Sequence, residues 1–382
     1  MAFYPRFGTV QTLALILVLL FIPTVSRADS GDAPIAEILE PVLADLSHVG
    51  VLGSALAIDI PGQDTLFITA GHVSKERAVA VDASRLFQIG SQTKMFTTAA
   101  ILLLEREGKL SLADPVAKYV TGVTGSPDVT IEHLLTHTGG IGDSITLFDP
   151  PAVRPDYHVS LDDHLLLGRV SGKQFEAGES WHYNNLGFVI LGRIVEVASG
   201  QPLNEFVHTK LLQPLGMDST WLGALESYPE TRMARGYFIE ENSGDLNDST
   251  VPDLSWASSA GDMVSNLADM LTWSNALLEK DNPAGLSLDD FRRVVVPTGS
   301  DGNMKHYGLG IMGRNLNGHE LWGHGGNIHG YVTLTLVDPE TGIMVVLMTS
   351  LLDYPDNLLP ALESVVSMAF HMSLLQMRIE ED

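Results

Sequence analysis

The chain has 382 residues, 45% of them hydrophobic and 18% charged, which is a globular composition with room for a large core or two lobes. Acidic residues outnumber basic ones by 47 to 22, for a formal net charge of −25, and the basic residues form no runs. Nucleic acid and anionic membrane surfaces are therefore poor partners, and the absence of cysteine excludes disulfides, thiolate metal sites and a cysteine nucleophile.

The first 28 residues have the features of a secretory signal peptide. Arg6 supplies positive charge, ten apolar residues run from 13 to 22, and Ser26 and Ala28 stand at −3 and −1 of a cut after Ala28. A membrane span needs ~20 apolar residues, so an uncleaved anchor is the weaker alternative. We expect an exported protein, periplasmic or secreted, with no stable membrane span once the signal is removed.

Strands and then a buried helix follow. Residues 54–60 and 65–70 are β-rich runs on either side of a Pro-Gly turn, and residues 86–88 suggest a further strand. Residues 91–107 have a mainly apolar face and are stopped by Gly108, which predicts a buried helix. Further helical patterns occupy residues 129–136, 161–169, 186–199, 203–212 and 264–279.

The last third returns to strands. Residues 320–323 are expected to lead into a glycine-rich turn, residues 331–337 and 343–349 are two further strands, and residues 358–377 form a closing apolar helix. The predicted fold class is α+β, with an antiparallel sheet built from both termini, flanked by helices, and an inserted all-helical lobe. The expected division is an α/β lobe of residues 29–109 and 290–382, and a mainly helical lobe of residues 110–289.

Ser91 and Lys94 are the first candidates for chemistry. Three positions along a helix place two side chains one turn apart on the same face, so Lys94 can reach the Ser91 hydroxyl. Burial disfavours the charged form of a lysine, and a neutral amine can act as the base that a serine nucleophile needs. The Ser91 amide, at a helix N-terminus, is suited to stabilise an oxyanion. A helix-capping serine beside a surface lysine is the alternative.

Tyr183 and Asn185 are the second candidates, in the chain's one Y-x-N sequence, just before a helical pattern. A tyrosine acts as a base only if its pKa falls from ~10, and a nearby cationic lysine favours that fall. The amide of Asn185 can bind both a lysine and a substrate amide. A core tyrosine next to a loop asparagine is the alternative.

His324, Gly326 and Asn327 are the third candidates, in the sequence His-Gly-Gly-Asn after an apolar run. The glycines let a substrate backbone approach closely, and the Asn327 amide is a candidate second oxyanion donor. His324 can donate a hydrogen bond to a substrate carboxylate or oxygen. H-x-G also occurs at His48, His137 and His306, so context alone selects His324, and a turn histidine is the alternative.

Taken together, the chain resembles the serine β-lactamase and penicillin-binding-protein superfamily, near its class C-like and D-alanyl-D-alanine carboxypeptidase branch. That superfamily carries S-x-x-K, Y-x-N and K-T-G or H-x-G boxes in this order. The resemblance covers roughly residues 35–370. It extends to Phe-Gln-Ile-Gly before Ser91, and to residues 108–115, 134–140, 214–217 and 307–310.

The resemblance implies an acyl-enzyme mechanism. Ser91 attacks a carbonyl, Lys94 and Tyr183 carry the proton to the leaving group, and water releases the acid with Tyr183 as base. The amides of Ser91 and Asn327 hold the oxyanion. His324 stands where many β-lactamases have lysine, a fixed cation for the β-lactam carboxylate, which argues against efficient β-lactamase activity. The His137-Thr138-Gly139 sequence precedes Tyr183 and so breaks the box order.

Several functions are compatible with these residues. The favoured one is an exported hydrolase of D-amino-acid peptides or amides, like a DD-carboxypeptidase, without cofactor or metal. A carboxylesterase of the same fold, a β-lactamase and a non-catalytic binding module are alternatives, so the partner is a small peptide, ester or β-lactam. His133 and His137 are spaced i, i+4, but the sequence lacks the H-E-x-x-H of zinc proteases, and we expect structural histidines.

Overall fold

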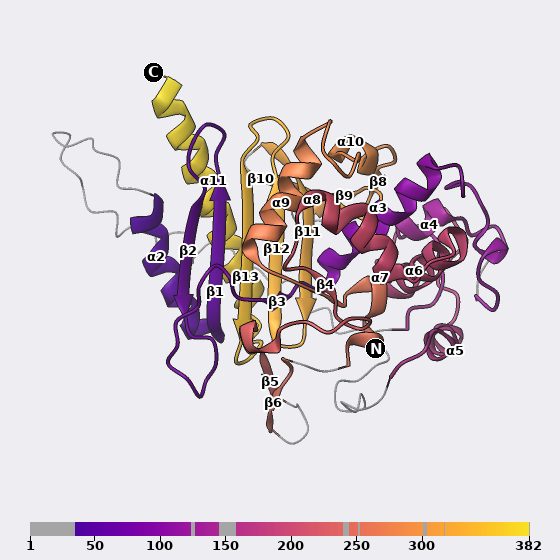
Figure 1. Ribbon diagram of the computed structural model, residues 1–382, viewed down its shortest axis with the longest axis horizontal. Helices are drawn as coiled ribbons and strands as arrows, with labels where there is room; N and C mark the ends of the chain where they lie inside the picture. The colour runs from indigo at the N-terminus through magenta and orange to yellow at the C-terminus, as the bar shows by residue number, and fades with distance from the viewer. Residues whose placement is uncertain are drawn as a thin grey trace. The chain divides into compact units, whose positions relative to one another are not determined.

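An antiparallel sheet of eight strands organises the residues described by this computed structural model, which are 35–123, 127–144, 158–239, 244–250, 253–300, 304–316 and 318–381 (Figure 1). Residues 35–382 group as one unit, and the predicted signal peptide lies outside the described residues. In spatial order the strands are β2 (Leu66–Gly71), β1 (Val51–Asp59), β13 (Met344–Leu351), β12 (Tyr331–Val337), β11 (His319–Ile328), β10 (Met312–Leu316), β9 (Met304–Tyr307) and β8 (Val296–Pro297).

Both ends of the chain contribute to this sheet, as predicted. β1 pairs with β13 in antiparallel register from Val51 opposite Leu351 to Asp59 opposite Met344. Smaller sheets accompany it among the described residues: β3 (Phe87–Gln88), β7 (Met263–Ser265) and β4 (Trp221–Leu222) form one, and β5 (Tyr237–Ile239) and β6 (Leu246–Asp248) another.

The helices match the periodic segments of the sequence closely. The segment between the two sheet-forming ends holds helices together with the short strands β4 to β7, and its separation as a lobe stays a prediction. The α-helices are α2 (Ile35–Asp45), α3 (Thr93–Arg106), α4 (Ile131–Leu135), α5 (Leu161–Ser171), α6 (Asn185–Ser199), α7 (Leu203–Val207), α8 (Gln213–Leu215), α9 (Leu267–Leu278), α10 (Leu288–Phe291) and α11 (Leu358–Glu381).

Hydrophobic clusters cover both faces of the sheet, because side chains alternate along each strand. On β13, Val345 and Leu347 face α2 and α11, whereas Val346 and Met348 face the cluster that contains α9 and α3. Figure 1 shows α9 and α11 on opposite faces. The predicted α+β fold with an antiparallel sheet between helices is therefore confirmed, and the face that carries α3 holds the predicted nucleophile.

Helix α11 is long and apolar enough to cross a membrane by length and composition over Leu358–Arg378. Its apolar side, which includes Leu362, Val365 and Phe370, is buried in the cluster between the sheet and α2. A core helix of a soluble protein passes the same test of length and composition.

One local prediction is wrong. Residues 320–323 were expected to lead into a glycine-rich turn, but β11 continues through Ile328 and pairs with β12 from Trp322 to Ile328. Gly323 and Gly326 are needed for close packing of this strand, whereas Gly325 has room for a Cβ. A Cβ on Gly326 would overlap the carbonyl oxygen of Ile89, so the strand approaches the start of the nucleophile's helix closely.

Candidate active site

Ser91 lies in a 3-10 turn (Gly90–Gln92) that leads directly into α3. Gly90 has φ +53°, and a Cβ there would lie 3.0 Å from the backbone nitrogen of Asn327, so both the left-handed backbone and the close contact require glycine. The hydroxyl of Thr93 donates to the Gly90 carbonyl at 2.7 Å and accepts from the Met263 amide at 3.1 Å. These bonds fix the turn that presents the Ser91 hydroxyl.

Lys94 sits one turn further on, fully buried in α3. Its Nζ is 3.1 Å from Ser91 Oγ, 2.8 Å from Asn185 Oδ1 and 2.7 Å from the Ala260 carbonyl oxygen. Burial lowers the pKa of Lys94 from 10.5 to about 7, against an opposing effect of the nearby Asp143 charge. A neutral Lys94 can donate to Asn185 and Ala260 and still accept the proton of the Ser91 hydroxyl.

Asn185 is held by an acid that the sequence analysis missed. Asp143 is buried, and its Oδ1 accepts from the backbone amides of Asn185 at 3.1 Å and Leu186 at 3.0 Å, at the N-terminus of α6. Its Oδ2 accepts from Asn185 Nδ2 at 3.3 Å. The amide oxygen of Asn185 is thereby turned toward Lys94, and the helix N-terminus favours the negative charge.

Tyr183 precedes the residue that caps α6. Asn184 accepts from the Gly187 amide at 2.7 Å through its side chain, which starts the helix and leaves Tyr183 just outside it. Lys94 Nζ lies 4.8 Å from the centroid of the Tyr183 ring. The structure therefore brings Ser91 and Lys94 together with Tyr183 and Asn185 from two separate parts of the chain, although the proton route between them stays a prediction.

His324 lies inside β11 and is fully buried. Its Nδ1 is 2.6 Å from the Gly325 carbonyl oxygen, which can only accept, so Nδ1 carries the proton and Nε2 accepts from the Tyr307 hydroxyl at 3.0 Å. Burial, with the nearby Lys94 charge, lowers the pKa of His324 to about 3, so the ring is neutral near pH 7. A hydrogen bond from His324 to substrate stays a prediction, and it would require one of these two bonds to be exchanged.

Gly326 and Asn327 pass beside the nucleophile's turn. Gly326 packs against Ile89, and the backbone nitrogen of Asn327 is next to Gly90. The Asn327 side chain donates instead to the Tyr354 hydroxyl at 2.9 Å. The backbone amide is thus the part of Asn327 that lies beside Gly90, the residue before Ser91, and its role as an oxyanion donor stays a prediction.

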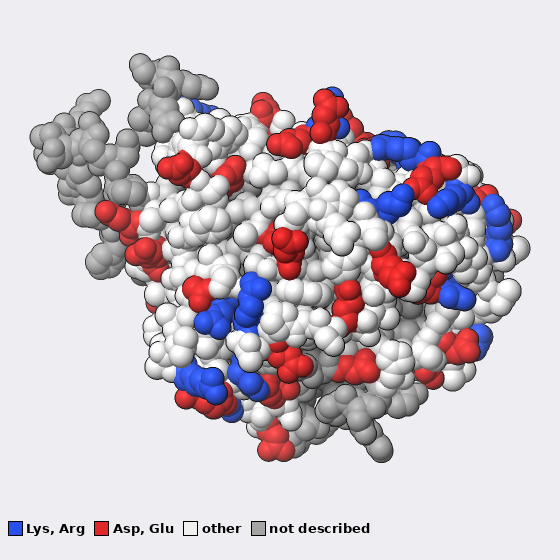
Figure 2. All heavy atoms as spheres, in the orientation of Figure 1, with Lys and Arg blue, Asp and Glu red and all other residues white. Residues whose placement is uncertain are grey.

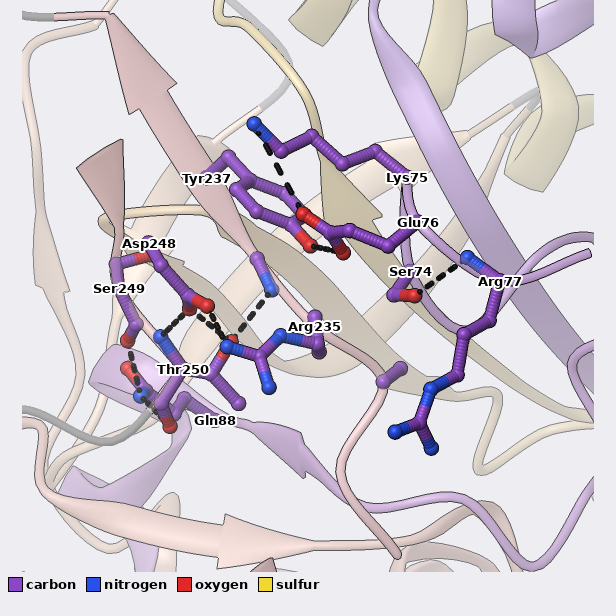
Figure 3. A network of polar contacts seen from close by, with 12 residues as sticks. Ser74, Lys75, Glu76, Arg77, Gln88, Arg235, Tyr237, Asp248, Ser249 and Thr250 are labelled. Carbon is purple, nitrogen blue, oxygen red and sulfur yellow. Dashed lines mark hydrogen bonds and ion pairs between the residues drawn. The ribbon is translucent and has the colours of Figure 1, made fainter. Parts of the chain in front are cut away.

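A polar network fastens the strand before Ser91 to its surroundings (Figure 3). Gln88 Nε2 donates to the carbonyl oxygens of Ser249 at 2.9 Å and Thr250 at 3.1 Å. In the same view Tyr237 donates to Glu76 at 2.7 Å, and Arg235 is paired with Asp248. These contacts tie β5, β6 and the loop at residues 74–77 to the start of the site.

The two histidines with i, i+4 spacing each bind a backbone amide. His133 Nδ1 accepts from Thr130 at 3.2 Å, and His137 Nδ1 accepts from Asn184 at 3.1 Å. Among the described residues, the group with metal-ligand geometry is elsewhere, at His319, Asp338 and Glu340. Both oxygens of Asp338 there already accept hydrogen bonds, from the Glu340 amide and the Thr341 hydroxyl.

The comparison with known proteins agrees with this geometry. The model of the family described as Beta-lactamase matches residues 37–363. The chain belongs to the beta-lactamase family. The predicted resemblance is confirmed. One residue from each box of this beta-lactamase family chain lies close to the next: Lys94 Nζ is 4.8 Å from the Tyr183 ring, and the Tyr183 and His324 ring centroids are 6.2 Å apart.

Individual relatives of the beta-lactamase family are distant in sequence. Penicillin-binding protein 4* of Bacillus subtilis (strain 168) is 29% identical over 298 residues, which are 74% of this chain and 64% of that protein. The chain thus spans just under two thirds of the length of the curated relatives it matches first.

Two solved structures are close in fold. The D-amino acid amidase from Ochrobactrum anthropi SV3, complexed with L-phenylalanine amide, superposes with a TM-score of 0.81 at 26% identity and covers 90% of this chain and 99% of the amidase. A D-stereospecific amidohydrolase from Streptomyces sp. has a TM-score of 0.73 at 28% identity, with 84% of this chain and 94% of the other covered.

Proposed function

We propose that the protein is a serine hydrolase that forms an acyl-enzyme on Ser91 and cleaves D-amino-acid amides in preference to D-peptides. The observation that carries the proposal is the contact of Lys94 Nζ with Ser91 Oγ at 3.1 Å inside a buried site that lowers the pKa of the lysine to about 7. A neutral lysine can remove the serine proton at physiological pH.

The chemistry proceeds in two halves. Ser91 Oγ forms a bond to the substrate carbonyl carbon while its proton passes to Lys94, and the Ser91 and Asn327 backbone amides bind the oxyanion. The proton then passes through Tyr183 to the leaving nitrogen, and the amine or ammonia departs. Water attacks the acyl carbon and gives one proton to Tyr183 or Lys94. The bond from that carbon to Ser91 Oγ then breaks, Oγ takes the proton back, and the acid is released.

Because His324 is neutral, we expect a substrate whose leaving group carries no carboxylate. A DD-carboxypeptidase or a β-lactamase gains from a cation opposite the substrate carboxylate, and a histidine with a pKa of about 3 supplies none. An amide needs hydrogen bonds rather than a counter-charge. The two amidohydrolases with similar folds add support for this substrate class.

A rate panel tests the proposal. D-Alanine amide, D-phenylalanine amide and their L-enantiomers would be compared with a D-alanyl-D-alanine peptide, p-nitrophenyl acetate and a chromogenic cephalosporin, with Ser91→Ala as the inactive control. We expect turnover of D-amides above all others. Ester turnover ~10³-fold faster than amide turnover, about 4 kcal/mol of differential transition-state binding, would identify a carboxylesterase instead. Preferential cleavage of the peptide or the cephalosporin would likewise refute the amide assignment.

Export is a separate proposal, based on the charge and apolar run of residues 1–28. The intact mass of protein recovered from the periplasm or medium of an expressing bacterium should correspond to a chain that starts at Asp29. Recovery of the full-length chain in the cytoplasm alone would contradict it.

The exposed face in Figure 2 has most of its basic side chains beside acidic ones, in agreement with ion pairs such as Arg293 with Glu105 and Lys210 with Glu107.

A further inference from the structure

His137 has an unusual backbone conformation next to the site. Its φ is 60°, in the left-handed region, which a residue with a Cβ disfavours and a glycine does not. It is buried, and Gly139 and Gly140 follow it in the same loop. A strained non-glycine residue beside an active site points to a role for its side chain.

The hydrogen bonds of His137 reach both neighbours of Tyr183. Its carbonyl oxygen accepts from the His182 amide at 3.1 Å, and its Nδ1 accepts from the Asn184 amide at 3.1 Å. Tyr183 is the residue between those two amides. One residue therefore holds the backbone on both sides of the proposed proton carrier.

The imidazole of His137 also packs on the Tyr183 ring. The two ring centroids are 4.4 Å apart, and the ring centroids of Tyr307 and Phe188 lie 4.5 and 5.2 Å from that of His137. This packing leaves little room for the ring to turn. Burial, with the nearby Lys94 charge, holds the pKa of His137 well below its usual value, so the ring is neutral. The hydrogen bond from the Asn184 amide to Nδ1 then places the remaining proton on Nε2.

We propose that His137 is the positioning residue of Tyr183. It fixes the phenol relative to Lys94 by accepting hydrogen bonds from the backbone amides of His182 and Asn184 and by packing its ring on the Tyr183 ring. This inference rests on the proposed function, in which Tyr183 carries the proton. His137 itself does not touch the reacting atoms. The loop that the sequence analysis set aside as out of box order thus supports the second box.

His133 provides a matched control. Its Nδ1 also accepts from a backbone amide, that of Thr130, but this bond caps α4 and not the Tyr183 segment. The test compares His137→Gly, which relieves the backbone and removes the ring, with His137→Asn, which tolerates the left-handed conformation and keeps a short acceptor. His133→Asn and Tyr183→Phe complete the set, each assayed for kcat, KM, the pH profile of kcat/KM and melting temperature.

We expect His137→Gly to lower kcat by ~10²-fold with KM within about threefold, because a small displacement of a catalytic group is costly. Its pH profile should shift, and His137→Asn should recover at least about tenfold of the lost kcat. His133→Asn should lower the melting temperature while leaving kcat and the pH profile unchanged. If His137→Gly does not fold, His137→Ser, whose side chain is too short to replace the ring, takes its place.

Two results would overturn the inference, and they differ in what else they affect. If Tyr183→Phe loses activity but His137→Gly loses no more kcat than His133→Asn, His137 has no positioning role and the proposed function stands. If Tyr183→Phe keeps a near-wild-type rate, the proton route of the proposed function fails, and this inference fails with it.

Discussion

Asp143 fixes which way the side-chain amide of Asn185 faces. It accepts from the backbone amide of Asn185 at 3.1 Å and from the side-chain nitrogen at 3.3 Å, so the amide oxygen is left 2.8 Å from Lys94 Nζ. The carboxylate thereby acts on the base twice, through this oriented dipole and through its own charge, which opposes the effect of burial on the pKa of Lys94.

Replacing that carboxylate should move the pH dependence of the reaction. In Asp143→Asn the charge that raises the pKa of Lys94 is gone, so the pKa falls further and the acid limb of kcat/KM moves to lower pH. The rate itself should fall about tenfold, because Asn185 is held less firmly. Asp262→Asn is the control. Burial raises the pKa of Asp262 to about 8, so it is largely uncharged at neutral pH, and the acid limb should stay in place.

The lowered pKa of Lys94 predicts that kcat/KM increases with pH. The neutral amine is the active form, so kcat/KM for an uncharged amide should rise tenfold per pH unit below about 7 and level off above it. A profile that is flat from pH 5 to 8 would show that Lys94 is not the base. An amide whose own groups do not titrate in this range, such as an N-acylated D-amino-acid amide, separates enzyme from substrate ionisation.

The same burial has a consequence for stability. Because the pKa of Lys94 is about 7 in the folded protein and 10.5 ordinarily, the unfolded chain binds more protons in between, and stability gains from this group as pH rises from 7 toward 10.5. Lys94→Met removes this contribution. We therefore expect the melting temperature of the wild type, relative to Lys94→Met, to improve between pH 6 and pH 9. An unchanged difference would contradict the assigned pKa.

Adjacent glycines of β11 should respond differently to a methyl group. Gly326→Ala places a Cβ onto the Ile89 carbonyl, so the strand must move away from the nucleophile's turn and kcat should fall ~10²-fold. For Gly325→Ala the nearest atom is 3.7 Å away, at ordinary contact distance, and the rate should stay within about twofold of wild type. Steady-state kinetics on both variants would decide. Equal losses would mean that the close approach has no catalytic consequence.

Removing the Tyr307 hydroxyl should destabilise the protein, because it is the hydrogen-bond donor to the buried His324 ring. Tyr307→Phe leaves Nε2 of His324 without its donor in a fully buried position, which should lower the free energy of unfolding by about 1–3 kcal/mol. Urea denaturation measures this directly. Tyr237→Phe, which loses a more accessible bond to Glu76, should cost less. Were the two losses equal, the bond to His324 would contribute no more than this partly buried one.

Much of this site follows from local sequence, because its parts are short-range. The i, i+3 spacing of Ser91 and Lys94 on a helix and the start of α6 after Tyr183 both depend on neighbouring residues, and both were predicted correctly. Asp143 was missed, since it binds residues more than forty positions away. Its loop carries no periodic pattern that would indicate the partner.

The errors have the same origin. A glycine-rich turn was expected to follow residues 320–323, whereas β11 continues and Gly326 lets it lie against Ile89, far away in the chain. His137 gave no local sign of its left-handed backbone, which is maintained by hydrogen bonds to His182 and Asn184. Contacts between distant segments decided each of these positions.

The pairing of β1 with β13 makes the order of synthesis matter. β13, the last of the described strands, leaves the ribosome long after β1. Val51 can therefore pair with Leu351, and the sheet can form across β1 and β13, only when most of the chain has been synthesised. Contacts of such wide sequence separation form slowly, so a nascent or truncated chain keeps its apolar strand faces exposed. A chain that stops before β13 should therefore be inactive and prone to aggregate, however complete its catalytic residues are.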